Sequence, residues 1–246
     1  MKTIQFKMLT IGVLLLAGLT GTVNAQDATT IMKKVDDVMY APKDMRAVNK
    51  IVLTDRNGRT DTREATIAQM GTNYRIFRFT KPASQAGISV LSLPDDVMYL
   101  YMPAFGKVRR ISSSIKNQNF AGTDFSYDDM ESKPLTEKYN GKLLKTEGNT
   151  YVLQLTPKSQ RSAYSKVIMS VNKENFYPVE MQFYDRGNHE IKVAQYTFIK
   201  IGKYWNTEKI TLKDLKKDHT TSMIMSDVKY DTGLTKNDFT VRKLQE

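Results

Sequence analysis

The sequence predicts a mainly β (α+β) protein whose strands follow one another in an antiparallel meander. Residues 45–230 contain about a dozen short stretches in which apolar and polar side chains alternate. Turn residues such as Gly, Asn and Asp separate these stretches, and only one segment shows a helical repeat. No internal repeat, low-complexity tract or linker divides the pattern, so a single domain is expected.

The first 25 residues are typical of a cleaved secretory signal peptide. Lys2 and Lys7 flank the start of an apolar stretch at residues 8–19, and Val23-Asn24-Ala25 precedes the expected cleavage at Gln26. This apolar stretch is too short to span a bilayer, which needs ~20 residues. We therefore expect a domain at residues 26–246 that is soluble outside the cytoplasm. The chain has no Cys, which excludes both disulfides and a lipobox.

The charge balance restricts the class of partner. The formal net charge is +11, and loss of the leader with its two lysines lowers it to +9. This excess suits anionic lipid headgroups or an acidic partner protein, or it serves only for solubility. Because the protein is expected to be secreted, no nucleic-acid partner is expected.

One helix is expected at residues 27–40. Ile31, Val35, Val38 and Met39 recur at helical spacing, while charged residues occupy the other faces. Pro42 ends the segment.

The strands follow from residue 45 onward, and about eleven or twelve of them are expected to form the sheet. Asn57-Gly58 and Gly187-Asn188 mark two hairpin turns. Residues 233–239 are expected to form a turn or short helix before a final extended stretch at 240–244. The candidate strands lie at 46–56, 59–70, 74–80, 89–93, 97–102, 108–112, 135–145, 150–156, 165–172, 179–186, 190–203, 209–216 and 222–230.

These strands carry more apolar surface than one helix can cover. Leu153 and Leu155 share one face of their strand, as do Met181 and Phe183, and their neighbours are polar. The sheet must therefore close on itself or curl around a cavity. An integral outer-membrane barrel would alternate in the same way, but it needs strands of ~9–11 residues and is not favoured here.

The sequence contains no recognisable catalytic or metal-binding motif, and a secreted hydrolase is the least favoured hypothesis for its function. The chain has no Cys and two histidines, His189 and His219, both in sequences typical of solvated turns. The acidic pairs, such as Asp95-Asp96, also lie in turn-like sequence. The sequence therefore predicts a protein that is not an enzyme and has no cofactor or metal.

Two features suggest binding. The first is the methionine content of the apolar faces, which fits either core packing or a surface that accepts varied apolar shapes. The second is Arg109-Arg110, followed by Asp124, Asp128 and Asp129. These charges form either an ion pair that holds the loop to the sheet, which we favour, or a contact for a partner.

The central block resembles the LolA-like outer-membrane lipoprotein-sorting family. The resemblance is carried by Tyr99-Leu100-Tyr101-Met102-Pro103, Lys107-Val108-Arg109-Arg110-Ile111 and Gly122-Thr123-Asp124-Phe125-Ser126-Tyr127-Asp128-Asp129. It implies a strongly curved antiparallel half-barrel that encloses a hydrophobic cavity under one or a few lid helices. It further implies a soluble periplasmic carrier for lipoprotein acyl chains or another amphiphile, or alternatively an envelope protein-binding or sensory module.

The carrier interpretation sets the expected site and partners. The partners would be an acylated lipoprotein or lipid, with an inner-membrane exporter and an outer-membrane acceptor as candidates. The protein would be a monomer that contacts membranes only transiently. The family signature or partner surface comprises Arg109, Arg110, Asp124, Phe125, Asp128 and Asp129. The candidate lipid-binding residues are the apolar ones on the expected inner faces: Phe77, Phe79, Leu91, Leu93, Met98, Leu100, Leu153, Leu155, Met181, Phe183, Met223 and Met225.

Overall fold

The structure, a computed structural model, describes residues 23–246 and contains one antiparallel sheet of 13 strands. All but the last three residues of the predicted leader lie outside the described residues. The strands are β1 (Asp44–Thr54), β2 (Thr60–Met70), β3 (Tyr74–Lys81), β4 (Ser89–Leu93), β5 (Val97–Met102), β6 (Lys107–Arg110), β7 (Tyr139–Glu147), β8 (Thr150–Pro157), β9 (Lys166–Asn172), β10 (Pro178–Tyr184), β11 (Glu190–Ile201), β12 (Tyr204–Asp214) and β13 (His219–Tyr230).

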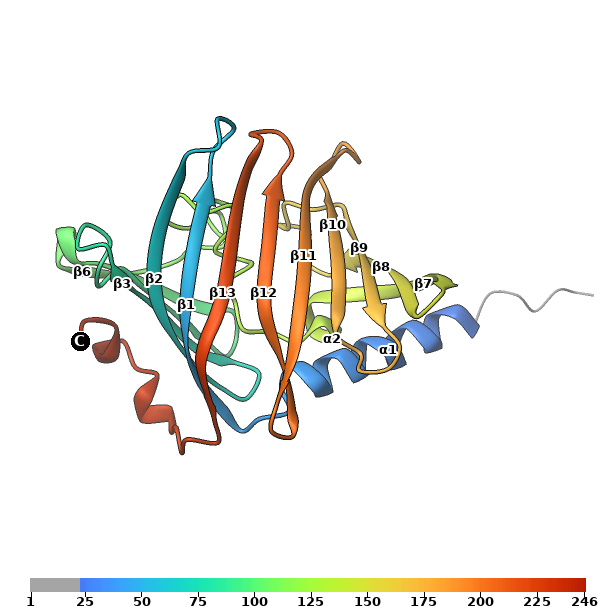
Figure 1. The fold of residues 1–246 in the computed structure, drawn as a ribbon, viewed down its shortest axis with the longest axis horizontal. Helices are drawn as coiled ribbons and strands as arrows, with labels where there is room; N and C mark the ends of the chain where they lie inside the picture. The colour runs from blue at the N-terminus through green and yellow to red at the C-terminus, as the bar shows by residue number, and fades with distance from the viewer. Residues whose placement is uncertain (1–22) are drawn as a thin grey trace, which may run out of the picture.

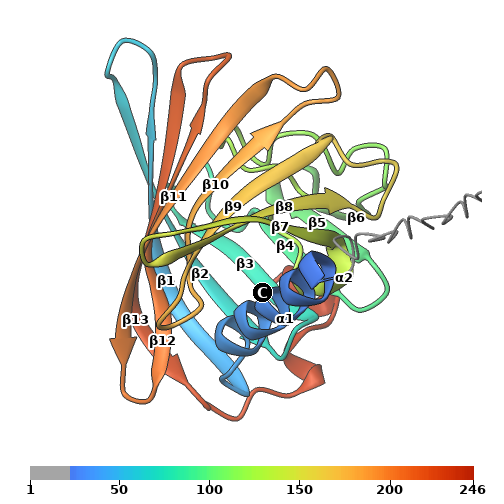
Figure 2. The ribbon, with the colours of Figure 1, turned by 90° about the vertical axis from the view of Figure 1, so that its right-hand side faces the viewer.

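The sheet consists of two meanders that meet where β1 pairs with β13. Its strand order is β6-β5-β4-β3-β2-β1-β13-β12-β11-β10-β9-β8-β7, so β6 and β7 are the two edges. No pairing joins these edges in the described part of the chain, and the sheet curves into an open half-barrel (Figures 1 and 2). The predicted curved antiparallel fold is confirmed, with slightly more strands than the eleven or twelve expected.

The hairpin turns form where Gly and Asn predict them. At the β1–β2 turn, Gly58 adopts a φ of 78°, a left-handed conformation that favours glycine. Asp55 Oδ1 accepts hydrogen bonds from the backbone N–H groups of Asn57 and Arg59. Asp185 does the same at the β10–β11 turn. A carboxylate that satisfies turn N–H groups stabilises each tight reversal.

Helix α1 (Val23–Met39) covers part of the concave side of the half-barrel (Figure 2). Ala28, Ile31, Met32 and Val35 are buried, and the helix packs on β7, β12 and α2 (Leu135–Lys138). Gly141 of β7 makes this close approach possible, since a Cβ there would lie 2.3 Å from the Met32 sulfur. The helical periodicity therefore corresponds to a face that packs against the sheet.

Residues 111–134, named here the crossing segment, connect the two edges of the sheet from β6 to α2 and β7. Its side chains Phe120, Phe125 and Met130 are buried in the main core. The Phe120 ring centroid lies 5.7 Å from that of Phe77 and 5.5 Å from that of Phe79. The crossing segment therefore shares with α1 the role of covering the concave face.

The C-terminal residues cover a second apolar cluster on the opposite face of the sheet. Leu234, Phe239 and Leu244 pack there with Ile76 and Leu91. The short helix expected before residue 240 is present as η2 (Lys236–Asp238). The prediction of an extended stretch at 240–244 is wrong: η3 (Arg242–Leu244) lies there, because this chain end has no strand partner and satisfies its backbone in a tight turn.

Two predicted strand starts also differ from the structure. The strand expected at 135–145 begins with α2, because the Asp36 carboxylate of α1 accepts the N–H groups of Leu135 and Thr136. The strand expected at 209–216 already begins at Tyr204. The remaining helical turn is η1 (Pro103–Phe105) between β5 and β6.

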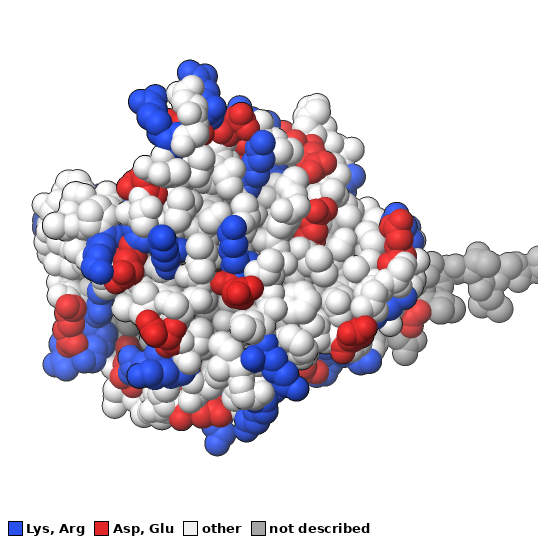
Figure 3. Space-filling model, viewed as in Figure 1, with Lys and Arg blue, Asp and Glu red and all other residues white. Residues whose placement is uncertain are grey.

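The outer face of the sheet has no extended patch of one charge. Figure 3 shows Lys and Arg interspersed with Asp and Glu over the face seen in Figure 1. Within residues 23–246, no helix is long and apolar enough to cross a membrane.

Candidate ligand-binding site

A cavity of about 250 Å³ lies on the concave side of the sheet. Its wall comes from strands β1 to β3 and β9 to β13, while α1, α2 and the crossing segment contribute the cover. Most lining side chains are apolar, with Met the commonest type among them. The cavity therefore offers flexible, polarizable contacts to an apolar ligand.

Five of the predicted lipid-binding residues line this cavity: Phe77, Met181, Phe183, Met223 and Met225. They come from β3, β10 and β13, which lie far apart in the sequence and meet across the curved sheet. Five others, Phe79, Met98, Leu100, Leu153 and Leu155, belong to the main core beside the cavity without lining it.

Leu91 and Leu93 do not face the cavity, and their assignment to the inner face is wrong. Both pack into the second cluster beneath the C-terminal residues, on the other face of the sheet. Strand β4 is buried on both faces, with Val90 in the main core and Leu91 opposite. A strand that is apolar on both sides gives no sequence signal for which side is inward.

Several cavity residues were missed by the sequence reasoning. Ala194 and Tyr196 of β11 line the cavity, as do Gln69 and Arg75. Arg75 precedes Phe77 by two positions, so period-two alternation would have placed it on the same face. It was overlooked because a charged residue is not expected in an apolar wall.

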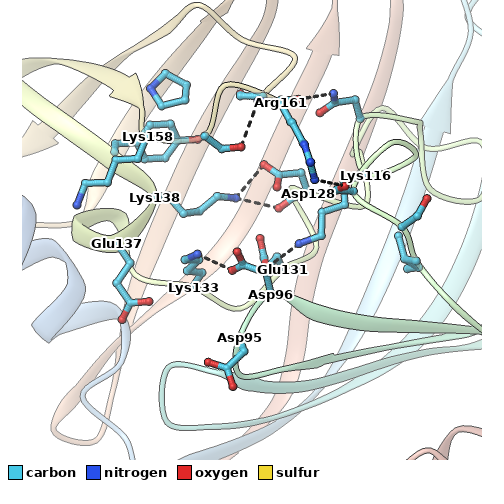
Figure 4. Close-up of a pocket in the computed structure, with 18 of the residues that line it drawn as sticks. Asp95, Asp96, Lys116, Asp128, Glu131, Lys133, Glu137, Lys138, Lys158 and Arg161 are labelled. Carbon is cyan, nitrogen blue, oxygen red and sulfur yellow. Dashed lines mark hydrogen bonds and ion pairs between the residues drawn. The ribbon is translucent and has the colours of Figure 1, made fainter.

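A polar cleft of about 720 Å³ adjoins the cavity between the two edges of the sheet. The two spaces share Glu131, Lys133, Lys138 and Tyr139 as lining residues. Three ion pairs lie in the cleft (Figure 4): Lys116–Glu131 at 2.9 Å, Lys133–Asp96 at 2.5 Å and Lys138–Asp128 at 3.0 Å. Most of its charge is therefore already compensated.

Lys138 stands at the boundary between cleft and cavity. Burial lowers its pKa, but Tyr139, Asp128, Asp129 and Glu131 outweigh this effect and raise the pKa of Lys138 above its usual value. Burial also raises the pKa of Tyr139 to about 12. Lys138 therefore stays charged and Tyr139 neutral at physiological pH, and the boundary keeps a fixed charge pattern.

The acids of the family signature do not pair with Arg109 and Arg110, contrary to the favoured interpretation. Both arginines are exposed, and no ion pair links them to a carboxylate within residues 23–246. Asp124 bonds to His219 and Thr221 instead, and Asp128 to Lys138. Arg110 lines the polar cleft together with Asp128, but the acids take their partners from β13 and α2.

Asp124 anchors the crossing segment to the sheet. Its carboxylate is 1% exposed, and its Oδ2 lies 2.7 Å from both His219 Nδ1 and Thr221 Oγ1. Lys192 Nζ donates to the Asp124 carbonyl oxygen at 2.6 Å. The expectation that His219 is a solvated turn residue is wrong, because it begins β13 and binds this carboxylate. His189 does lie exposed in a turn, beside Asp185.

Sequence comparison identifies a family for most of the chain. A family model whose description reads "Uncharacterized protein" matches residues 71–246. No curated protein matches the chain.

Solved structures with the same fold cover nearly the whole chain. A domain from Vibrio parahaemolyticus assigned to outer-membrane lipoprotein sorting is 26% identical, with a TM-score of 0.85 over 91% of this chain and 100% of its own. A DUF1329 family protein from Desulfovibrio piger is 25% identical with the same score and coverage. A LolA superfamily protein from Nitrosomonas europaea is 24% identical, with a TM-score of 0.75 over 90% of this chain and 100% of its own.

Proposed function

Because this chain belongs to the LolA-like outer-membrane lipoprotein-sorting family, we propose that it is a periplasmic carrier for lipoprotein acyl chains or another amphiphile. The observation that supports this most directly is the apolar cavity under α1 and the crossing segment, which adjoins a polar cleft. An amphiphile needs both environments, one for its chain and one for its polar part.

The energetics of such a carrier require no catalytic group. Burial of an acyl chain is worth ~0.8 kcal/mol per methylene, so about ten buried methylenes contribute roughly 8 kcal/mol before the costs of binding. Of the two histidines, His189 is 76% exposed and His219 is bonded to Asp124. We therefore assign this protein to carriers rather than enzymes, working between an inner-membrane exporter and an outer-membrane acceptor.

Native mass spectrometry with lipid extraction tests this proposal, on protein purified from the periplasm without detergent. The expected result is co-purifying lipid, fatty acid or acylated peptide. Ala194, which is 2% exposed and lines the cavity, allows a matched variant. Ala194→Trp should fill the cavity and remove the bound lipid, whereas Lys229→Trp at an exposed position should keep it. A ligand-free mass for the unaltered protein, with no thermal shift on adding lipids, would refute the carrier.

A protein-binding or sensory module is the second candidate. It is favoured by Arg109 and Arg110, which are exposed and have no carboxylate partner among the described residues, beside Phe105, which is 60% exposed. Arg110→Glu should leave bound lipid unchanged and weaken a partner contact. Loss of lipid from folded Arg110→Glu protein would count against an apolar pocket as the lipid site.

A further inference from the structure

Arg75 is a cation placed within the apolar cavity. It lies on β3 two residues before Phe77, and both side chains face the concave side. Together with Tyr40 and Gln69 it lines the cavity and a small neighbouring pocket, and none of the three lines the polar cleft. Both Arg75 and Tyr40 are partly buried, and this burial lowers the pKa of Arg75 and raises that of Tyr40.

No carboxylate neutralises Arg75. Its Nε–H and one Nη2–H donate to Gln69 Oε1 at 3.0 and 2.6 Å, and the rest of the described chain supplies no acceptor for its other N–H groups. The acids that line the cavity accept hydrogen bonds elsewhere: Asp129 from Ser126, Glu131 from Lys116 and Glu208 from Thr197. Asp44, which lines a small neighbouring pocket with Arg75, accepts them from the backbone of residues 232–234.

An uncompensated guanidinium in such a place is costly. A guanidinium remains protonated in proteins, so it cannot escape the cost by losing its charge. A partly desolvated ion without an opposite charge nearby destabilises the protein. Asn49, which is 2% exposed and also lines the cavity, has an Oδ1 atom without a hydrogen-bond partner. The cavity thus holds two polar groups that a purely hydrocarbon ligand would leave unsatisfied.

The size of the cavity restricts the ligand further. Its 250 Å³ is below the ~300 Å³ at which typical small-molecule sites begin, which fits one chain better than several. In the adjoining cleft, Lys116, Lys133 and Lys138 are paired with acids, whereas Arg110, Lys158 and Arg161 have no acid partner within residues 23–246, but these three do not line the cavity. Among the basic residues that line the cavity, Arg75 is therefore the one without an acid partner in the described part of the chain.

We propose that the cavity binds a single-chain anionic amphiphile whose carboxylate or phosphate accepts hydrogen bonds from Arg75. Its chain lies along Phe77, Met181, Phe183 and Met223. This inference rests on the proposed carrier function and adds the class and orientation of its ligand: the anionic end lies inside the cavity rather than in the cleft.

Comparison of matched ligands tests the proposal. Binding of laurate, monododecyl phosphate and dodecanol is measured on delipidated full-length mature protein by displacement of a fluorescent fatty-acid analogue. Because a charge-assisted hydrogen bond inside a protein is strong, at least one anionic ligand should bind tenfold or more tighter than dodecanol. Whether laurate or the phosphate binds more tightly identifies the end group.

Variants then assign the preference to a residue. Arg75→Met should reduce the ratio of acid to alcohol affinity to about one and leave dodecanol binding unchanged, since only the charged contact is lost. Arg110→Met removes the same charge from the exposed rim of the cleft and should keep the preference. Should Arg75→Met not fold, Arg75→Lys, which keeps the charge with fewer donors, should retain a reduced preference.

The results that would contradict the Arg75 site, the ligand orientation and the carrier function differ from one another. Equal affinity for dodecanol and both anions, or a preference that survives in Arg75→Met, would overturn the Arg75 site while leaving the carrier intact. Loss of the preference in Arg110→Met instead would place the anionic group in the cleft and overturn the proposed orientation. If none of the three ligands binds the unaltered protein, the carrier function itself fails together with the inference.

Discussion

At the scale of single residues, Asp124 illustrates how one buried carboxylate holds a long connection in place. Its carboxylate is hydrogen-bonded to Thr221 and His219 of β13, and its backbone carbonyl accepts a hydrogen bond from Lys192 of β11. Its backbone N–H also donates to Thr221 Oγ1, so the backbone and the side chain of this aspartate are both bonded to the sheet. The crossing segment, which has no regular secondary structure of its own, depends on such side-chain contacts for its position.

We predict that Asp124→Ala lowers the free energy of unfolding by about 2–4 kcal/mol, because it leaves buried polar partners unsatisfied. Asp218→Asn is the control, since Asp218 forms an exposed pair with Lys213 and Asn tolerates its left-handed backbone (φ 51°), so this change should cost less than about 1 kcal/mol. Urea unfolding of both variants measures the difference. Equal effects would show that Asp124 is no anchor.

Asp44 gives a pH-dependent prediction. Burial raises the pKa of Asp44, but hydrogen bonds from Thr232, Leu234 and Gly233 outweigh it and leave the pKa below its usual value. A carboxyl whose folded pKa is lowered adds stability above its unfolded pKa of ~3.9 and loses it as pH falls through the folded value.

Asp44→Asn should therefore be less stable than the unaltered protein at pH 7, by about 1–2 kcal/mol. The gap should narrow as the pH falls below ~4, where the unaltered carboxyl becomes protonated as well. Unfolding free energies measured across this pH range check the prediction. A gap that stays constant with pH would contradict the assigned role.

At the scale of elements, the link between α1 and α2 is a single carboxylate. Asp36 accepts hydrogen bonds from the backbone N–H of Leu135 at 2.7 Å and from the N–H and Oγ1 of Thr136 at 3.0 and 2.7 Å. The sequence pattern of 135–145 predicts one strand, and nothing local indicates that its first turn is helical. The helical turn depends on Asp36, which is 99 residues away from Leu135 in the sequence.

The adjacent aspartates Asp36 and Asp37 provide a matched test. Asp36→Ala should lower the free energy of unfolding by about 1–3 kcal/mol, because it leaves the first N–H groups of α2 unsatisfied. Asp37 forms an exposed pair with Lys33, so Asp37→Ala should change stability by less than about 0.5 kcal/mol. Thermal and urea unfolding compare the two. If both variants lower the free energy of unfolding equally, the contact between Asp36 and α2 does not stabilise the attachment of α1.

At the scale of the whole molecule, the sheet and its cover are held by different forces. Backbone hydrogen bonds connect all 13 strands from β6 to β7, whereas α1 and the crossing segment are attached largely by side chains. A cavity of about 250 Å³ cannot admit several acyl chains unless part of its wall moves. Helix α1 and the crossing segment can move without breaking the backbone hydrogen bonds of the sheet.

Amide hydrogen exchange should locate this movement. On binding an amphiphile, we expect protection to change in α1 and residues 111–134, while the central strands β1 and β13 remain as they were. Mass spectrometry of peptides from the free and loaded protein provides the measurement. Changes confined to the central strands would mean that the sheet itself opens.

The period-two alternation and the turn residues by themselves determined the meander, because strand pairing and hairpin formation depend on local chemistry. They also placed Phe77, Met181, Phe183, Met223 and Met225 on inner faces. On β10 this follows from the polar neighbours Glu180 and Gln182, whereas β3 is apolar on both faces, with Ile76 opposite Phe77. The family signature added the half-barrel and its cavity. The sequence could not orient β4, which is apolar on both faces, nor assign partners to Asp124.

Only the tertiary structure decided which residues from distant parts of the sequence are in contact. The C-terminal residues cover Leu91, His219 meets Asp124 from 95 positions away, and Arg75 stands in an apolar wall without an acid. These relations depend on curvature and on the packing of segments distant in the chain. Side-chain periodicity reports which face a residue occupies, but not which partner that face meets.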